Sequence, residues 1–431
     1  MSPGVNAGDT AWMLAATALV LLMTPALGLF YAGLVRSKNT LNTFMMCIAA
    51  MGVALITFAF VGYSVVFDGD GALFGGLGFA FLDGVGFDPR EGLTIPHLLF
   101  FAFQATFCVI TTALVSGAVV ERMRFGAFLV FAALWSVLVY SVLAHWVWGG
   151  GWLAEMGVLD FAGGVPVEMA SGFSALAAAL VIGARKDYGR QALLPHNSVY
   201  VLLGAGLLWF GWFGFNGGSG FAAGNSGVLA FVNTLLTPAV TLTVWMILDL
   251  LRNRQITAIG AATAIIVGCV AITPAGGYIS PIWAIGLGAL AALPSYAVIV
   301  WRPRTRVDET LDVLAAHGVA GLTGMVFIGL FAQESWNGLA DGLFYGNAEQ
   351  LGLQLLAIVA ACAYAFGATF VLLKVVGALM PLRATAREES LGMDLVAHGE
   401  EAYASGEGAI LVEPDGHFEG RLVADPDPVA A

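Results

Sequence analysis

Residues 160–184 read DFAGGVPVEMASGFSALAAALVIGA, an apolar stretch that is long enough to cross a bilayer but begins at Asp160 and holds Glu168 in its interior. An ionisable side chain at membrane depth costs roughly 2.5 to 3.5 kcal/mol on insertion scales, so such residues usually serve a function. No Lys or Arg lies within one helical turn of Glu168, so a charge partner must come from another helix. The only ionisable residue deep within another expected span is His317, and we expect these two side chains to pair.

The composition is that of a polytopic membrane protein. Of the 431 residues, 59% are hydrophobic and 11% are charged, whereas a soluble chain has about one quarter of its residues charged. Apolar runs of about 18 residues or more recur along the whole chain, as transmembrane helices require. Because lipid cannot satisfy backbone polar groups, such runs must be helices or barrel strands, and these runs are too long for strands. The predicted fold class is therefore all-α.

Eleven transmembrane helices are predicted, followed by a tail. Residues 1–381 would form the transmembrane domain and residues 382–431 a cytoplasmic tail, while the first ten residues lack the basic cluster of a cleavable signal peptide. Because eleven is odd, the two termini should lie on opposite sides of the membrane. The expected spans cover approximately residues 11–34, 43–66, 96–119, 125–148, 160–184, 198–215, 228–251, 256–272, 278–301, 311–331 and 351–380.

The basic residues predict the orientation. All 17 Lys and Arg residues except Arg90 lie at or beyond the ends of the odd-numbered spans. Cytoplasmic segments carry an excess of Lys and Arg, so the N-terminus is expected outside and the C-terminus in the cytoplasm. A wrong number of spans would place basic residues on both sides of the membrane, so their one-sided distribution also supports the number of spans.

The order of the spans predicts two inverted repeats of five helices, with the eleventh helix added at the C-terminal end. Five is odd, so spans six to ten would be inverted relative to spans one to five, and such repeats place the substrate path at their interface. Glu168 lies in the last span of the first set and His317 in the last span of the second. Small residues three or four apart let helices approach closely. Such residues occur in both of these spans: Ala170, Ser171, Gly172, Ala175, Ala178, Ala179, Gly318, Gly321 and Gly324.

Several functional classes find no support in the sequence. The net charge of −12 comes mostly from the tail, and no nucleic-acid partner is expected. The four cysteines lie in apolar runs without motif spacing, so neither a disulfide nor a metal site is implied. No phosphate loop or dinucleotide fingerprint occurs, and we expect no cofactor, no catalytic residue and no enzymatic reaction. An intramembrane hydrolase with Ser171 as its nucleophile is disfavoured. Such an enzyme would need a base, an oxyanion pocket and a substrate gate in a water-filled cavity, and no helix-breaking gate is evident in the sequence.

Some residues allow two interpretations from position alone. Trp148, at the outer end of its span, is either an interface anchor or part of a cation site. Asp160 is either the N-cap of span five, accepting the backbone N–H of Ala162 or Gly163, or a direct ligand of an ion. His317 taken alone is as compatible with a hydrogen-bonded interior histidine as with a functional residue.

Eight stretches together resemble the ammonium transporter family (Amt/Mep/Rh), and most closely its bacterial Amt branch. The resemblance covers about residues 8–403, and its strength lies in the order and depth of motifs that would be weak singly. The matching stretches are residues 30–39 (FYAGLVRSKN), 103–107 (FQATF), 145–152 (HWVWGGGW), 160–164 (DFAGG), 211–219 (GWFGFNGGS), 272–278 (ITPAGGY), 317–321 (HGVAG) and 392–403 (GMDLVAHGEEAY).

The resemblance implies a homotrimer in membrane lipid, in the plasma membrane of a bacterium, with one narrow pore for ammonium in each protomer. In the family, an outer site recruits ammonium between an aromatic wall and a hydroxyl group. A ring face attracts such a cation by roughly 0.5 to 2 kcal/mol, and a hydroxyl oxygen accepts its N–H. The residues expected to form this substrate-binding site are Phe107, Trp148, Ser219, Asp160, Phe161 and Ala162.

The resemblance also implies a gate of stacked rings at Phe107 and Phe215, above a pore that two histidines line. The second histidine position matches His317, but the first holds Glu168, as in some fungal members of the family. We therefore expect a Glu/His proton relay and electrogenic transport. The tail motif implies a PII-type regulatory protein as a cytoplasmic partner. Two alternatives stay open: an ammonium sensor or transceptor that conducts little, and a passive gas channel of the Rh type.

Overall fold

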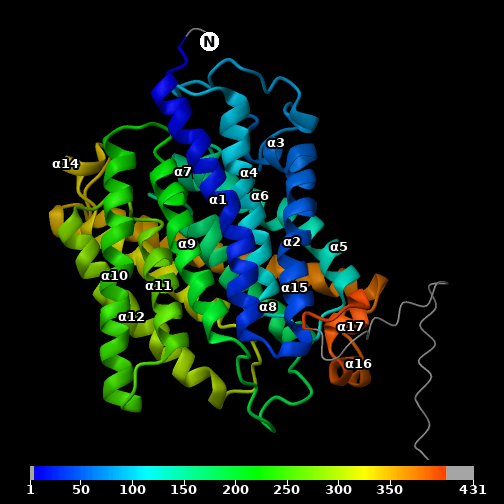
Figure 1. Cartoon of the computed structure of the whole chain (residues 1–431). Coiled ribbons are helices and arrows are strands. Elements are labelled where there is room, and N and C mark those ends of the chain that lie inside the picture. The colour runs from blue at the N-terminus through cyan, green and yellow to red at the C-terminus, as the bar shows by residue number, and fades with distance from the viewer. Residues whose placement is uncertain (1–3, 404–431) are drawn as a thin grey trace, which may run out of the picture.

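The computed structural model describes residues 4–403, a bundle of helices that run mostly along one common direction (Figure 1). The first helix begins at one end of the bundle, and the last two described helices lie at the opposite end (Figure 1). Within residues 4–403 no β-strand forms, which confirms the all-α prediction. Part of the predicted tail, residues 404–431, lies outside the described residues.

Ten helical segments in residues 4–403 are long and apolar enough to cross a membrane. They account for ten of the eleven predicted spans and confirm a polytopic membrane protein. The remaining predicted span corresponds to the 15-residue helix Ala258–Ile272, which extends only about 22 Å. The ten segments are Ala7–Leu34, Ser37–Phe67, His97–Ser116, Phe125–Glu155, Gly164–Ile182, Ser198–Gly218, Asn225–Asn253, Pro281–Arg304, Leu314–Phe331 and Ala348–Leu379.

Several of these segments are composed of more than one kind of helix. The α-helices are α1 (Ala7–Leu34), α2 (Thr40–Thr57), α3 (Tyr63–Phe67), α4 (His97–Ser116), α5 (Phe125–Trp135), α6 (Ser141–Trp148), α7 (Trp152–Glu155), α8 (Ala170–Ile182), α9 (Ser198–Gly218), α10 (Asn225–Asn253), α11 (Ala258–Ile272), α12 (Pro281–Trp301), α13 (Ala320–Phe331), α14 (Glu334–Asn337), α15 (Ala348–Leu379), α16 (Ala386–Leu391) and α17 (Met393–His398). Wider π-helical turns form η2 (Phe58–Gly62), η4 (Ser136–Tyr140), η5 (Gly164–Met169) and η7 (Leu314–Val319). Short 3₁₀ turns form η1 (Ser37–Asn39), η3 (Ala80–Leu82), η6 (Arg302–Arg304) and η8 (Leu343–Tyr345).

Asparagine side chains cap the N-terminal ends of three of the long helices. Asn6 Oδ1 accepts hydrogen bonds from Gly8 N (2.8 Å) and Asp9 N (3.1 Å) at the start of α1. Asn197 caps α9, and Asn347 caps α15, in the same manner. These caps satisfy backbone donors that have no partner within the helix, so the local sequence itself fixes where these spans begin.

Glycines let two pairs of helices cross in close contact. A methyl group at Gly204 of α9 would lie 2.6 Å from Phe30 N of α1. A methyl group at Gly172 of α8 would lie 2.3 Å from Gly318 N of η7. Because no side chain fits between these backbones, both pairs of helices approach closely, and the small-residue pattern predicted the second of these crossings. The second crossing lies one turn from Glu168 and next to His317.

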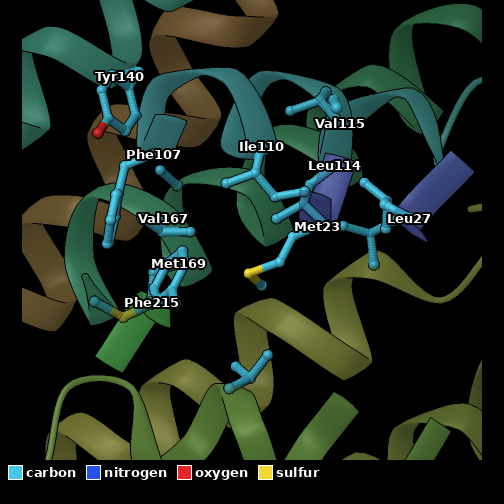
Figure 2. Close-up of a cluster of buried hydrophobic side chains, with 14 of the residues drawn as sticks. Met23, Leu27, Phe107, Ile110, Leu114, Val115, Tyr140, Val167, Met169 and Phe215 are labelled. Atoms are coloured by element: carbon cyan, nitrogen blue, oxygen red, sulfur yellow. The ribbon is translucent and has the colours of Figure 1, made fainter. Parts of the chain in front are cut away.

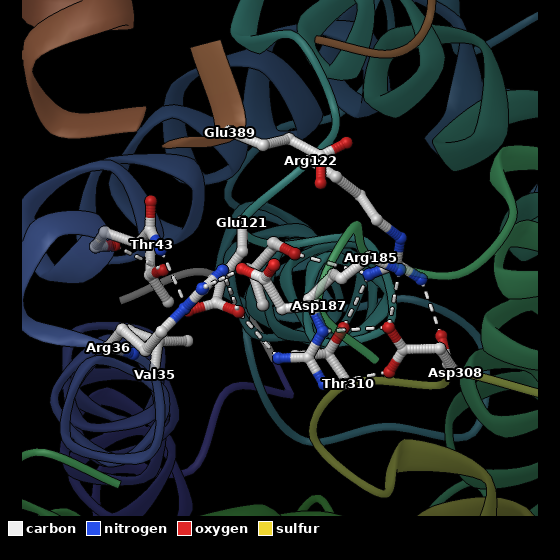
Figure 3. Close-up of polar contacts among 12 residues, drawn as sticks. Val35, Arg36, Thr43, Glu121, Arg122, Arg185, Asp187, Asp308, Thr310 and Glu389 are labelled. Carbon is white, nitrogen blue, oxygen red and sulfur yellow. Dashed lines mark hydrogen bonds and ion pairs between the residues drawn. The ribbon is translucent and has the colours of Figure 1, made fainter. Parts of the chain in front are cut away.

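A buried polar network joins the ends of several helices near α16 and α17 (Figure 3). Glu121 Oε1 accepts from Arg36 Nε (3.0 Å), and Glu121 Oε2 accepts from Arg185 Nη1 (2.6 Å). Arg185 Nη2 also donates to Asp308 Oδ1 (2.8 Å). Burial alone would raise the pKa of Glu121, but Arg185 and Arg36 outweigh burial and hold that pKa below its usual range. The network therefore stays charged, and it connects segments from both halves of the chain.

The described part of the tail packs onto this end of the bundle. Asp394 accepts hydrogen bonds from Leu41 N (3.0 Å) and Asn42 N (2.8 Å), so a tail carboxylate satisfies the start of α2. Glu389 accepts from Arg383 Nη2 (2.6 Å) and from Lys186 N (3.0 Å). The tail thus contacts both the α1–α2 connection and the loop after α8.

A side chain at the α8–η7 crossing should separate the two helices. We expect Gly172→Ala to lower the unfolding temperature of the purified protein, because its methyl group meets backbone atoms that cannot move aside. Gly52→Ala is the matched control, since no atom lies within 4 Å of a methyl group at that helical position. Thermal unfolding in detergent measures both variants. Equal unfolding temperatures for Gly172→Ala and the wild type would contradict the close crossing.

Candidate functional site

Two phenylalanine rings close the centre of the molecule. The rings of Phe107 on α4 and Phe215 on α9 stack with centroids 4.1 Å apart and planes at 30°. Both side chains are buried, and they lie at one end of an apolar cluster that continues through Ile110 and Leu114 (Figure 2). Stacked rings present no polar group to a passing solute, so this position disfavours hydrated ions.

A cavity of ≈ 320 Å³ lies on one side of this stack, toward the end of the bundle where α1 begins, and is named the outer cavity after the predicted position of the N-terminus. Of the six residues predicted to bind substrate, the structure places four in its lining: Phe107, Trp148, Phe161 and Ser219. The other wall residues are Phe67, Arg90, Glu91, Leu93, Phe100, Gln104, Val147 and Phe221.

Hydrogen bonds hold the ring and the hydroxyl group of the predicted cation site in place. Trp148 Nε1 donates to the carbonyl of Asp160 (3.1 Å), and its ring meets that of Phe107 at 84° with centroids 5.9 Å apart. Ser219 Oγ donates its hydrogen to the carbonyl of Phe215 (2.9 Å). The lone pairs of the Ser219 oxygen therefore remain to accept an N–H from a cation.

Asp160 caps the chain that leads into span five. Its carboxylate accepts hydrogen bonds from the backbone N–H groups of Gly163 (2.9 Å), Gly164 (2.7 Å) and Val165 (2.7 Å). The N–H of Ala162 instead donates to the carbonyl of Thr273 (3.2 Å), so Ala162 is not one of the capped residues. Asp160 therefore acts as an N-terminal cap, and its backbone carbonyl also accepts the hydrogen bond from Trp148 Nε1.

Glu168 and His317 form the expected pair. His317 Nδ1 and Glu168 Oε2 lie 2.8 Å apart, with 0% of the Glu168 surface and 4% of the His317 surface exposed. The second carboxylate oxygen, Oε1, makes no hydrogen bond to a residue in the described part of the chain. A buried carboxylate is costly unless it is paired, and His317 supplies the partner of Oε2.

Both members of the pair lie on π-helical turns. Glu168 belongs to η5 and His317 to η7, near the beginning of the segments Gly164–Ile182 and Leu314–Phe331. Wider turns of this type often mark functional sites, because they displace a side chain relative to a regular α-helix. Hydropathy does not reveal these turns, since they differ from α-helix in hydrogen-bond register alone.

An inner cavity of ≈ 380 Å³ begins at this pair and extends toward the end of the bundle that holds the tail. Phe215, Glu168 and His317 line one part of it, and Tyr188, Arg302 and other residues near the charged network line the rest. The Phe107–Phe215 stack thus separates the two cavities, with Phe107 in the outer lining and Phe215 in the inner one.

The sequence interpretation missed some of the aromatic wall. Phe100 and Phe103 precede Phe107 on α4 at helical spacing, and the rings of Phe103 and Phe107 lie 4.9 Å apart. The ring centroid of Phe221 lies 5.2 Å from that of Phe100 and 5.9 Å from that of Phe103. The spacing of seven between Phe100 and Phe107 could have predicted a shared face on α4, but the contribution of Phe221 depends on a distant loop.

Membrane-length helices and two cavities separated by stacked rings define an integral membrane protein of the transport class. The sequence profile of the Ammonium Transporter Family matches residues 11–403. The ammonium transporter of Bacillus subtilis (strain 168) is 46% identical over 399 residues, which cover 92% of this chain and 98% of that relative. This chain therefore belongs to the Ammonium Transporter Family. Members of a transporter family are not enzymes, which agrees with the sequence expectation.

Solved structures give the same assignment. The crystal structure of Saccharomyces cerevisiae Mep2 matches with a TM-score of 0.86 at 33% identity, covering 95% of this chain and 94% of that one. A structure titled Sensor Amt Protein matches with a TM-score of 0.84 at 28% identity, covering 91% of this chain and 98% of that one. The fold is therefore shared between a Mep2 protein and a protein described as a sensor.

The outer site should depend on its ring and its hydroxyl group. We expect Trp148→Leu to raise the half-saturating ammonium concentration roughly two- to thirtyfold, the equivalent of a lost cation–π contact, and to weaken discrimination against other small cations. Ser219→Ala should act in the same direction. Trp301→Leu, on an exposed face of α12, is the control. Unchanged affinity and selectivity in both cavity variants would exclude this site.

Proposed function

We propose that this chain carries ammonium across the plasma membrane of a bacterium, from the outer cavity through the Phe107–Phe215 stack and past the Glu168–His317 pair to the inner cavity. The observation that carries this proposal is family membership over residues 11–403. The arrangement of the cavities supports it, since each predicted pore residue lines one cavity or the stack between them.

Recruitment in this proposal takes place at the outer cavity. The ring faces of Phe107 and Trp148 attract ammonium, and the Ser219 oxygen accepts one of its N–H groups. The backbone carbonyl of Asp160 accepts a hydrogen bond from Trp148 Nε1, and its carboxylate lowers the energy of a cation nearby, although the carboxylate oxygens are engaged by backbone N–H groups.

Passage of the stack requires that ammonium release a proton. Ammonium minus one proton is ammonia, which is neutral and crosses an apolar constriction at far lower cost than the ion. The released proton passes the stack separately and is received on its inner side by the Glu168–His317 pair, which holds it as acid plus imidazole or as an ion pair until ammonia takes it up again in the inner cavity. Such a pair titrates as one unit. Ammonia and the proton together carry one charge across, so transport would be electrogenic.

The relay is tested by removing one titrating group at a time. Glu168→Gln keeps the shape of the side chain but cannot hold the mobile proton, and His317→Gln removes the imidazole. We expect each to lower the ammonium-evoked current in proteoliposomes by about tenfold or more and to flatten its pH dependence. Glu349→Gln, an exposed carboxylate at the start of α15, is the control. Wild-type currents with an unchanged pH profile in both relay variants would show that the pair is only structural.

The two alternatives predict different measurements. A sensor that conducts little would bind ammonium without current or uptake, and a gas channel would show uptake without current. The higher identity to the Bacillus subtilis transporter, 46% against 28% for the Sensor Amt Protein, favours transport. The ring-and-hydroxyl site favours a cation over a neutral gas as the recruited species.

We further infer eleven crossings arranged as two inverted five-helix repeats and a final helix, α15, with the N-terminus outside. The fully buried second half of α11 supports its assignment as a crossing that neighbouring helices shield from lipid. The paired positions of η5 and η7 support the repeat, as does the crossing of α1 with α9, the first helices of the two sets. A homotrimer in membrane lipid is also proposed, on the basis of the family resemblance.

The proposed domain division places the pore in residues 1–381 and regulation in the cytoplasmic tail, residues 382–431, with a PII-type protein as a partner. Asp394 accepts a hydrogen bond from α2 and Glu389 accepts one from the loop after α8, which gives the tail a physical route to the helices of the pore.

Removal of the tail should therefore alter transport without preventing assembly. We expect deletion of residues 385–431 to leave trimers intact and to change the maximal ammonium current by about twofold or more, because α2 and Lys186 lose their tail contacts. Deletion of residues 404–431 alone is the control, since it removes none of the contacts described above. A protein lacking residues 385–431 that fails to assemble would show that the tail is structural.

A further inference from the structure

Arg90 is a positive charge in the wall of the cavity that is proposed to recruit a cation. It lies in the loop between α3 and α4, and it is the one basic residue that does not lie at or beyond the end of an odd-numbered predicted span. A cation site with an arginine in its wall is unexpected, because like charges repel. The outer site therefore contains a feature that the proposed function does not explain.

The structure fixes this guanidinium group firmly. Its central carbon lies 4.9 Å from the ring centroid of Phe67 and 5.3 Å from that of Phe100. Arg90 Nη2 also donates to the carbonyl of Phe67 (3.1 Å). Two ring faces and a carbonyl stabilise a guanidinium group without neutralising it.

No carboxylate pairs with Arg90 among residues 4–403. Glu91 lines the same cavity, but it is exposed, so solvent screens its charge. Arg90 is half-buried against the rings, and its field is screened less. The positive charge of Arg90 therefore acts on any cation that occupies the cavity.

The distance to the site is short enough for this effect to matter. Phe100, under the guanidinium group, lies seven residues before Phe107 on α4, which corresponds to about 10 Å along the helix. Over such a distance, repulsion between unit charges changes a binding constant by roughly two- to tenfold at the dielectric constants of a partly solvated cavity.

We propose that Arg90 sets the affinity of the outer cavity for cations, by opposing the attraction of the aromatic rings and the Ser219 oxygen. Conduction requires a site that is favourable enough to enter but weak enough to leave. Arg90 keeps ammonium from being held in the outer cavity, so that it proceeds to the ring stack. This inference rests on the proposed function, since it concerns the affinity of the same site.

The test is an ammonium titration of the current in proteoliposomes whose outer face is toward the bath. Arg90→Met keeps an apolar stem over the two rings and removes the charge. We expect its half-saturating ammonium concentration to fall about two- to tenfold and its maximal current to fall as well, because tighter binding slows departure. Damage to packing alone would lower the current without lowering the half-saturating concentration.

Arg90→Lys is the matched control, because it keeps the charge while losing the planar contact with the rings. It should retain a half-saturating concentration near that of the wild type, and if Arg90→Met does not assemble, Arg90→Gln takes its place. An unchanged or higher half-saturating concentration in the neutral variant would overturn the inference, as would a Lys variant that behaves like the neutral one. Absence of current in the wild type would instead refute the proposed function.

Discussion

The 2.8 Å contact between Glu168 and His317 is the interaction on which the centre of the molecule depends. A lone carboxylate at membrane depth is costly, and its cost falls when a partner lies within hydrogen-bond distance. The partner is carried by a span that is 149 residues away in sequence, so two helices must meet closely. Gly172 and Gly318 permit that approach, because neither carries a side chain at the crossing. The small residues and the pair therefore form one structural unit.

The aromatic stack and the polar groups around it divide the path into chemically different parts. Outside the stack, aromatic rings, the Ser219 hydroxyl group and Arg90 line the cavity that we propose as the cation site. At the stack itself, Phe107 and Phe215 offer no polar atom to an ion. Beyond it, the Glu168–His317 pair lines the second cavity. This order of environments along the path agrees with the proposed release of a proton from ammonium at the Phe107–Phe215 stack.

The charged network at the tail end performs a different task from that of the central pair. Glu121, Arg36, Arg185 and Asp308 are paired at distances of 2.6 to 3.0 Å at the tail end of the bundle, where Arg185 also lines the inner cavity. Removing one partner of such a network would leave an uncompensated buried charge, so the network specifies how the two halves of the chain meet. The tail attaches to the same region through Glu389 and Asp394. A change in the tail can therefore reach helices that also carry pore residues.

The sequence by itself determined the class of protein, the position of nearly every span and the need of Glu168 for a distant partner. Those features follow from hydropathy, residue size and the cost of charge in lipid, which are all local properties. Only the tertiary structure decided that Asp160 caps Gly164 and Val165, that Glu168 and His317 lie on π-helical turns, and that Arg90 lines the outer cavity. These features depend on hydrogen-bond register and on contacts between segments far apart in the chain, and neither is encoded in the hydrophobicity of a single stretch.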